Sequence, residues 1–227
     1  MKDKPEISED LNKALEALLN EILILHKRFE IYKDLFGTNE EYVSLLNKTS
    51  GTFFYLVQSG FMENIILSIS RLSDPEEMNG YKNLSLKGLI SLIDNENLIN
   101  ELNLQVKWYT TKTTEFLKAW RSKKVAHLDF DTAMSKAKLK NDITIQNLEL
   151  AISSVRQFYN TIYNHYYGSK MVFGSNGDST SKSLLTSLEQ AKILREYIFD
   201  IRNLEEEIPD KLKVNSNKFI FKRDIKI

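Results

Sequence analysis

The chain has 227 residues, 42% of them apolar, which suffices for one large domain with a real hydrophobic core. Its 31 basic and 31 acidic residues balance, so any affinity for nucleic acid or membranes must come from local clusters of charge. The absence of cysteine excludes disulfide frameworks, thiolate zinc sites and cysteine nucleophiles.

No targeting or membrane signal is visible in the sequence. The N-terminal residues lack the apolar core of a signal peptide, and no apolar run approaches the roughly 20 residues that span a bilayer. A soluble, cytoplasmic protein without a membrane partner is therefore expected. Only three prolines and eight glycines occur, which favours long helices.

The first predicted element is a long helix from Ser8 to about Phe36. Ser8 is a good acceptor for a free backbone N–H of the first turn, and acidic residues follow it at the positive helix end. Apolar side chains then recur at steps of three and four, which indicates one buried face. They are Leu11, Leu15, Leu18, Leu19, Ile22, Leu25, Phe29 and Tyr32.

A second long helix is expected from about Asn39 to the segment Ser73–Pro75. Gly51 marks either a break in this helix or a close contact with another helix. Residues 74–84 are predicted to form a polar loop. Ser85 then caps a short helix that is expected to reach Asp94.

Two more helices complete the predicted bundle. The first runs from about Asn95 to Ala126, with an interruption considered near Leu104. Residues 128–144 are polar and mixed, so they are expected to connect it to the next helix. That helix is amphipathic and ends at Gly168.

The composition changes after this helix. Residues 169–182 are rich in glycine and serine, as is typical of a linker. A last helix and a short basic tail follow, and the tail is either a short strand or a segment that orders on a partner. We predict an all-α protein with a bundle of four or five helices over residues 1–168 and a C-terminal helix with its tail over residues 183–227.

One segment of the chain is locally basic. Between positions 107 and 124 a single acid, Glu115, stands among six basic residues: Lys107, Lys112, Lys118, Arg121, Lys123 and Lys124. Basic groups bind phosphates, and the interleaved aromatic residues offer faces on which bases stack. For the cluster alone we favour the structural alternative, in which the aromatic residues form core and the cations offset the negative helix end.

Arg121 and His127 stand near the predicted end of this helix. On an ideal helix six residues leave two side chains roughly 120° apart. The pair converges only if the helix ends before His127, if Arg121 reaches round, or if a second subunit supplies the same pair. The chemistry suits RNA cleavage without metal, because histidine transfers protons near neutral pH and arginine binds phosphate in a planar fork.

The spacing of this pair resembles the shared motif of the HEPN superfamily, an arginine followed by four to six residues and a histidine. The wider pattern resembles the abortive-infection AbiU-type group. Three stretches carry that resemblance, in this order: "ISRLSDP" at 69–75, "NLSLKGLISLI" at 83–93 and "WRSKKVAHLD" at 120–129. It covers roughly residues 10–165.

The resemblance implies an all-α homodimer in which two Arg–His pairs face each other across a cleft. It implies metal-independent endoribonuclease activity in toxin–antitoxin or phage-defence systems, with RNA and an antitoxin protein as partners and without a cofactor. Arg121 would hold the scissile phosphate, and His127 would be the general acid or base. The residues expected to bind RNA or phosphate beside them are Ser122, Lys118, Lys123 and Lys124.

A rival interpretation is a non-catalytic HEPN-like module that binds RNA, a nucleotide or a protein, because such bundles can lose their chemistry. Ser122 favours it, since asparagine or aspartate is common at that position of the family. A third interpretation is a helical interaction protein whose linker and tail dock a partner.

Glu63 and Arg71 lie within about 80° of each other in helical projection, so they could form a buried polar link that supports the site. We favour a structural role instead, either as an ion pair or with Arg71 as a helix-end cation near Asp74. His26 and His165 lack the spacing of zinc ligands and are expected in packing or at the surface.

Overall fold

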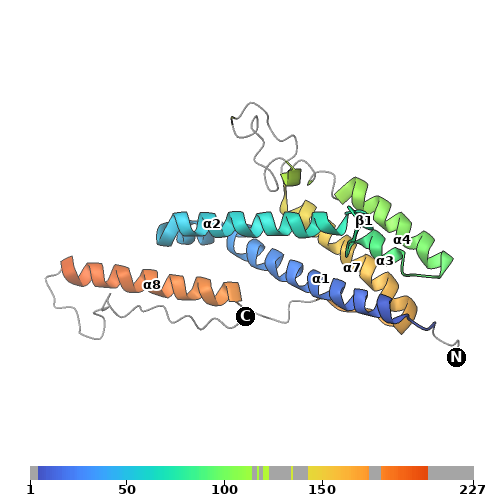
Figure 1. Ribbon diagram of the computed structural model, residues 1–227. Coiled ribbons are helices and arrows are strands. Elements are labelled where there is room, and N and C mark those ends of the chain that lie inside the picture. Colours follow the sequence, from blue (N-terminus) through green and yellow to red (C-terminus); the bar gives the residue numbers. More distant parts are fainter. Residues whose placement is uncertain are drawn as a thin grey trace. The chain divides into compact units, whose positions relative to one another are not determined.

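The computed structural model describes residues 5–113, 117, 120–122, 134, 143–173 and 180–203. These residues are helical except for turns, connecting segments and one two-stranded hairpin, so the prediction of an all-α protein is confirmed. The chain divides into two compact units, Met1–Ser181 and Lys182–Ile227. In the first unit the long helices lie side by side (Figure 1).

Helix α1 (Glu9–Phe36) begins where the sequence predicts. The Ser8 hydroxyl accepts a hydrogen bond from the backbone N–H of Leu11 (3.3 Å), and two acidic residues occupy the first turn. The side chains spaced by three and four residues are buried along its whole length. The helix therefore offers one continuous apolar face to the rest of the bundle.

Helix α2 (Glu40–Leu72) follows after a short turn and is capped by the side chain of Asn39, as predicted. It is kinked at Ser50, whose backbone leaves the helical region at φ −163° and ψ 79°. The kink adjoins Gly51, so the predicted break is confirmed. Helices α1 and α2 pack against each other.

A hairpin lies in the stretch predicted as a polar loop. Strands β1 (Glu77–Met78) and β2 (Tyr81–Lys82) pair in antiparallel fashion. Asn79 and Gly80 connect them with positive φ angles of 55° and 81°. This is the backbone of a type I′ turn, which an Asn-Gly pair adopts at low cost.

Helix α3 (Leu86–Ile90) is capped by Ser85, as predicted, but it is shorter than expected. The predicted extension to Asp94 is wrong. Backbone bonds of the i to i+3 type at Leu92 and Ile93 tighten the chain into turns directly after the helix.

Helix α4 (Glu96–Trp108) is capped by Asn95 and continues into the π-helix η1 (Tyr109–Thr113). The interruption considered near Leu104 is wrong, because Leu104 is an exposed residue within α4. The helix changes type at Tyr109 instead. There the hydroxyls of Thr110 and Thr111 donate to backbone carbonyls one turn back, which competes with regular helical bonding.

Helix α7 (Ile145–Tyr167) begins after the cap Thr144 and ends at Gly168, whose φ of 68° is the left-handed cap expected of glycine. It runs antiparallel to α1. At one end Ile145 approaches Gly37, and at the other the Tyr167 hydroxyl donates to Asn12 Oδ1 at 2.7 Å. The prediction of this helix is confirmed.

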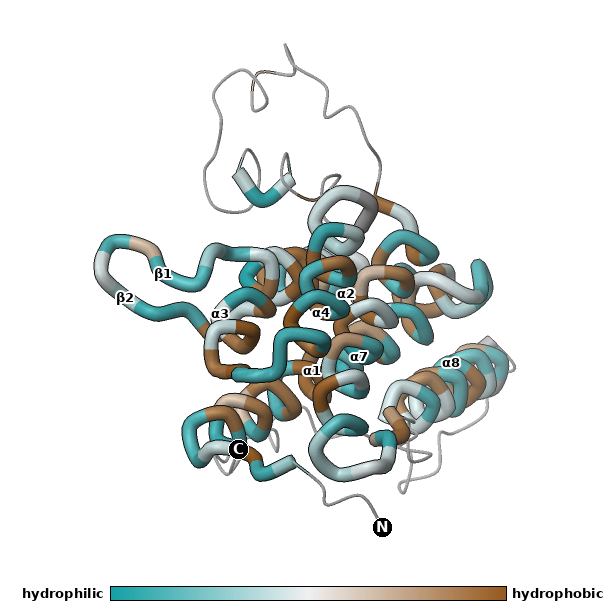
Figure 2. The backbone as a smooth tube through the Cα atoms, turned by 90° about the vertical axis from the view of Figure 1, so that its right-hand side faces the viewer, coloured by the Kyte–Doolittle hydropathy of each residue, from teal (hydrophilic) through white to brown (hydrophobic). Residues whose placement is uncertain are grey.

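Helices α1, α2, α4 and α7 enclose one hydrophobic core, to which α3 and η1 contribute. Apolar and polar stretches alternate along these helices (Figure 2), so each presents an apolar face to its neighbours. The largest buried side chains are Phe29, Tyr109 and Phe158, from three different elements. Gln105 adds a polar tie between α4 and α7 through Thr161 Oγ1 (2.9 Å).

The start of the predicted linker packs on the bundle. Asn160 of α7 holds both backbone groups of Met171, with distances of 3.0 and 2.8 Å. Residues 174–179 lie outside the described part of the chain. Helix α8 (Thr180–Asn203) then begins before the region 183–227 that is predicted to hold the last helix and its tail. The predicted basic tail also lies outside the described residues. None of the described helices is long and apolar enough to cross a bilayer.

Two glycines make a test of the packing around α3. A Cβ added at Gly88 would lie 2.4 Å from the backbone oxygen of Asn83, whereas one added at Gly60 meets nothing within 4 Å. We expect Gly88→Ala to lower the free energy of unfolding by about 1–3 kcal/mol through overpacking. Gly60→Ala should instead raise it by up to about 1 kcal/mol. Urea unfolding followed by circular dichroism measures both, and equal effects would contradict the described contact.

Candidate functional site

The candidate site is built around an ion pair between the end of α2 and a helical stretch at residues 120–122. Arg121 Nη1 donates to Asp74 Oδ1 at 2.6 Å, and Nη2 donates to Oδ2 at 3.3 Å, across 47 residues of chain. Two parallel bonds of this kind fix the plane of a guanidinium as well as its position. The side chains are 33% and 18% exposed, so the pair lies at the edge of the bundle and remains accessible to solvent.

Tight turns at the end of α2 place Asp74. The backbone N–H groups of Ser73 and Asp74 bond to carbonyls three residues back, at 3.0 and 3.1 Å. The Tyr109 hydroxyl donates to the carbonyl of Ile69 at 2.7 Å. Tyr109 is fully buried, and burial holds its pKa far above the usual range, so it remains a donor. η1 is thereby tied to the last turn of α2.

The chain beyond Asp74 is fixed as well. The Pro75 carbonyl accepts hydrogen bonds from Asn83 Nδ2 (2.9 Å) and from Ser85 Oγ (3.4 Å). These bonds close the base of the hairpin and join it to the cap of α3. The three stretches of sequence at 69–75, 83–93 and 120–122 therefore meet in space.

A pocket of about 320 Å³ is lined by residues of α1 and α2 and by Trp120, and its last lining residue on α2, Ile66, stands eight residues before Asp74. Trp120, the residue before Arg121, forms part of its wall and packs partly against the core. The remaining lining residues come from α1 and α2: Tyr32, Gln58, Ser59, Met62, Glu63 and Ile66. The pocket thus combines aromatic and apolar walls with three polar side chains. No sequence pattern predicts this pocket, because its residues come from three separate segments of the chain.

The structure describes part of the predicted site. Arg121 and Ser122 are helical, and Ser122 is exposed. The other predicted members, His127, Lys118, Lys123 and Lys124, lie outside the described residues. The role of Asp74 as the partner of Arg121 was missed, although Asp74 belongs to the quoted stretch "ISRLSDP".

The less favoured alternative, a buried link between Glu63 and Arg71, is wrong. Both residues are exposed, and Arg71 Nη2 lies 3.6 Å from Glu21 Oε2 on α1 and donates to Ser68 Oγ at 3.4 Å. Eight residues advance a helix by about 12 Å, so two side chains at this spacing stand two turns apart. The favoured alternative, a structural role for Arg71, agrees with its contact to α1. Glu63 lies in the lining of the pocket instead.

The two described histidines are packed against the bundle. His26 Nδ1 and His165 Nε2 are buried ring nitrogens without a hydrogen-bond partner among the described residues. Burial lowers the pKa of His26, and the nearby Arg156 and Lys33 lower it further, while Glu30 raises it. No three His, Asp or Glu side chains in the described part of the chain gather as metal ligands would.

A family model for HEPN domains described as AbiU2 matches residues 8–184. No curated protein and no solved structure matches the chain. The matched range contains the whole helical bundle and both residues of the Asp74–Arg121 ion pair.

A double-mutant cycle measures this ion pair. We expect Asp74→Ala and Arg121→Ala to destabilise the protein individually and to be less than additive together, with a coupling of about 1 kcal/mol. The pair Glu21 and Arg71 is the matched control, because it is longer and is exposed to 45% and 58%. Its coupling should be a few tenths of a kcal/mol at most. Equal couplings from urea unfolding would contradict the described geometry.

The lowered pKa of His26 predicts a pH-dependent stability. A histidine whose folded pKa lies below the unfolded value of about 6.5 binds protons more readily when unfolded. The free energy of unfolding should therefore fall as the pH drops through 6.5 towards the folded pKa. His26→Gln removes this titration, so the variant should lose less stability than the parent between about pH 7.5 and pH 5.5. Urea unfolding at the two pH values tests this, and identical losses would rule out His26 as a source.

Proposed function

Since the chain belongs to the AbiU2 family of HEPN domains, we propose that it is an endoribonuclease that acts on RNA without a metal ion. The observation that carries this proposal is the fixed guanidinium of Arg121 at the edge of the bundle. A guanidinium has five N–H donors, so it can hold a phosphate oxygen while two of them serve Asp74. Asp74 is thus a positioning residue for a phosphate-binding arginine.

In the proposed reaction the RNA cleaves itself with help from the protein. The 2′-hydroxyl oxygen attacks the neighbouring phosphorus as its proton leaves, and the bond from phosphorus to the 5′-oxygen breaks as that oxygen gains a proton. The products are a 2′,3′-cyclic phosphate and a 5′-hydroxyl end. His127 transfers a proton, because imidazole titrates near neutral pH. Arg121 stabilises the charge that develops on the phosphate oxygens.

The surrounding basic residues are proposed to bind the RNA backbone. Ser122 follows Arg121 and is exposed, which suits a hydrogen bond to a neighbouring phosphate. The lysines proposed to act with it are Lys118, Lys123 and Lys124. Because the chain as a whole is neutral, such a cluster would supply the attraction to RNA locally.

We propose that the active form is a homodimer that brings two Arg–His pairs to one cleft. The setting proposed is phage defence or a toxin–antitoxin system in the cytoplasm, where an antitoxin protein restrains the cleavage. The support for both is the family to which the chain belongs.

The second candidate function is a non-catalytic module that binds RNA, a nucleotide or a protein. One observation favours it: the carboxylate of Asp74 compensates the charge of Arg121 in the free protein. A guanidinium paired in this way attracts a phosphate less strongly than an unpaired one.

Cleavage in excess EDTA separates the two functions. The purified protein should convert RNA into fragments with cyclic phosphate ends, while sedimentation counts its subunits. His127→Ala should slow cleavage at least about 100-fold, and Arg121→Ala should do so to a similar degree. Arg195→Ala on α8 is the matched arginine control and should leave the rate unchanged. Binding of RNA without fragments from the folded parent would reject the enzyme and support the module.

A further inference from the structure

We propose that the pocket lined by Trp120 binds a single RNA base, with guanine preferred, in the RNA that is cleaved at Arg121. The inference rests on the proposed endoribonuclease function and adds a sequence preference to it. Three features of the pocket support it: an aromatic wall, a polar row on one face of α2, and a lining residue, Trp120, that directly precedes Arg121 in the chain.

The aromatic wall suits a flat ring. Trp120 and Tyr32 line the pocket, and Met62 and Ile66 provide apolar surface between them. Every base has a π-face that stacks on an aromatic side chain, and this contact tolerates any base. Tyr32 is nearly buried and shares a side-chain hydrogen bond with Gln58, so its ring is held in place. These walls supply affinity but not selectivity.

The polar row supplies the selectivity. Gln58 and Met62 are four residues apart on α2, as are Ser59 and Glu63, so all four lie on the face that lines the pocket. An ionised carboxylate only accepts hydrogen bonds, whereas an amide both donates and accepts. Guanine carries adjacent N–H donors on one edge and suits the Glu63 carboxylate. Uracil has no amino group, so it offers the Glu63 carboxylate fewer donors and is expected to bind most weakly.

The position of the pocket links it to the cleavage site. Trp120 and Arg121 are consecutive, so their Cα atoms lie about 3.8 Å apart. Successive side chains on a helix diverge by about 100°, and the α2 residues that line the pocket end eight residues before Asp74, so the pocket and the guanidinium are separate sites. An RNA strand whose cleaved phosphate lies at Arg121 would therefore place the base of a nearby nucleotide in the pocket. The volume of about 320 Å³ is at the lower end of ligand sites, which suits one base.

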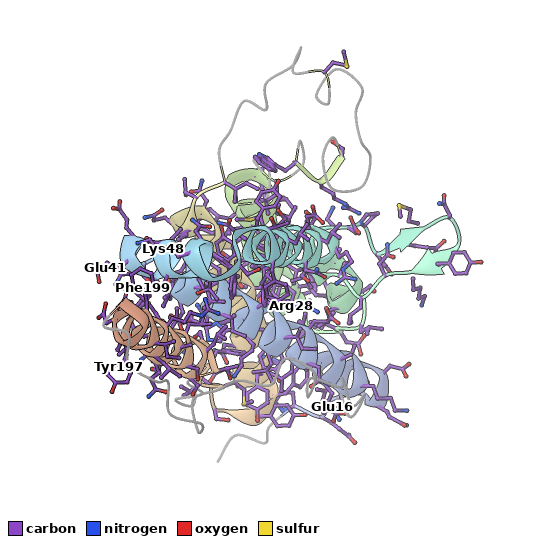
Figure 3. The ribbon with its side chains drawn as sticks, turned by 90° about the vertical axis from the view of Figure 1, so that its left-hand side faces the viewer. Glu16, Arg28, Glu41, Lys48, Tyr197 and Phe199 are labelled. Atoms are coloured by element: carbon purple, nitrogen blue, oxygen red, sulfur yellow. The ribbon has the colours of Figure 1, made fainter. Side chains whose placement is uncertain are left out.

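A second hollow of about 310 Å³ on the same helices provides a control. Its lining residues are Arg28, Val57, Gly60, Phe61 and Asn64, and Figure 3 labels Arg28 on α1. It contains an arginine, an aromatic ring and an amide, but no carboxylate, and it does not include a neighbour of Arg121 in sequence. Asn64→Ala is therefore a matched variant that removes an amide from the wrong pocket.

Nucleotide binding is tested first, independently of cleavage. The chain has two tryptophans, so Trp108→Phe leaves Trp120 as the only one. Guanosine 3′-monophosphate should quench its fluorescence in a saturable way, and uridine 3′-monophosphate should bind about tenfold more weakly. Glu63→Gln in this background should remove most of that difference, while Asn64→Ala should preserve it. Equal affinities of the parent for the two nucleotides would overturn the guanine preference.

Cleavage is then tested on a random RNA pool by sequencing the fragment ends. The parent should show guanine at one fixed position near the cut, and Glu63→Gln should lose this preference while it still cleaves. If the parent cleaves without preference and neither nucleotide quenches Trp120, the pocket proposal fails and the nuclease stands. If guanosine 3′-monophosphate binds but no RNA is cleaved, the endoribonuclease proposal is rejected and the proposed base-binding pocket is retained.

Discussion

The bidentate ion pair between Asp74 and Arg121 is the constraint on which the site depends. It joins the end of one long helix to a stretch 47 residues later, at the edge of a core that α1, α2, α4 and α7 share. The pair is partly exposed, so its value for stability is modest. Its main effect is orientation, because the two bonds fix the plane of the guanidinium and so determine where a phosphate can approach.

Much of the fold follows from local sequence signals. Ser8, Asn39, Ser85, Asn95 and Thr144 each cap a helix, because a short polar side chain satisfies a free N–H of the first turn. Two features were not predicted. The Asn-Gly pair is a signal for the tight turn of a hairpin, although the surrounding residues are polar as in a loop. The early end of α3 rests on backbone turns at Leu92 and Ile93, for which the sequence carries no residue signal.

The candidate site was less predictable than the fold. Arg121 was found through its spacing and through the resemblance to a family, not through its surroundings. Its partner Asp74 is distant in sequence, and a carboxylate after a helix carries no mark of what it will contact. The pocket beside Trp120 is harder still, since it exists only after two helices and a third segment have packed together. Glu63 illustrates this, because helical projection related it to Arg71 although the two lie two turns apart.

The π-helix η1 affects how the faces of the following helix are assigned from the sequence. A π-helical turn holds about one residue more than an α-helical turn, so it shifts the phase of a following helix by about 100°. A helical wheel drawn through Tyr109–Thr113 as ordinary helix would misassign the faces that come after it. Within the described residues, the change of phase falls at Tyr109, whose buried hydroxyl ties η1 to the last turn of α2.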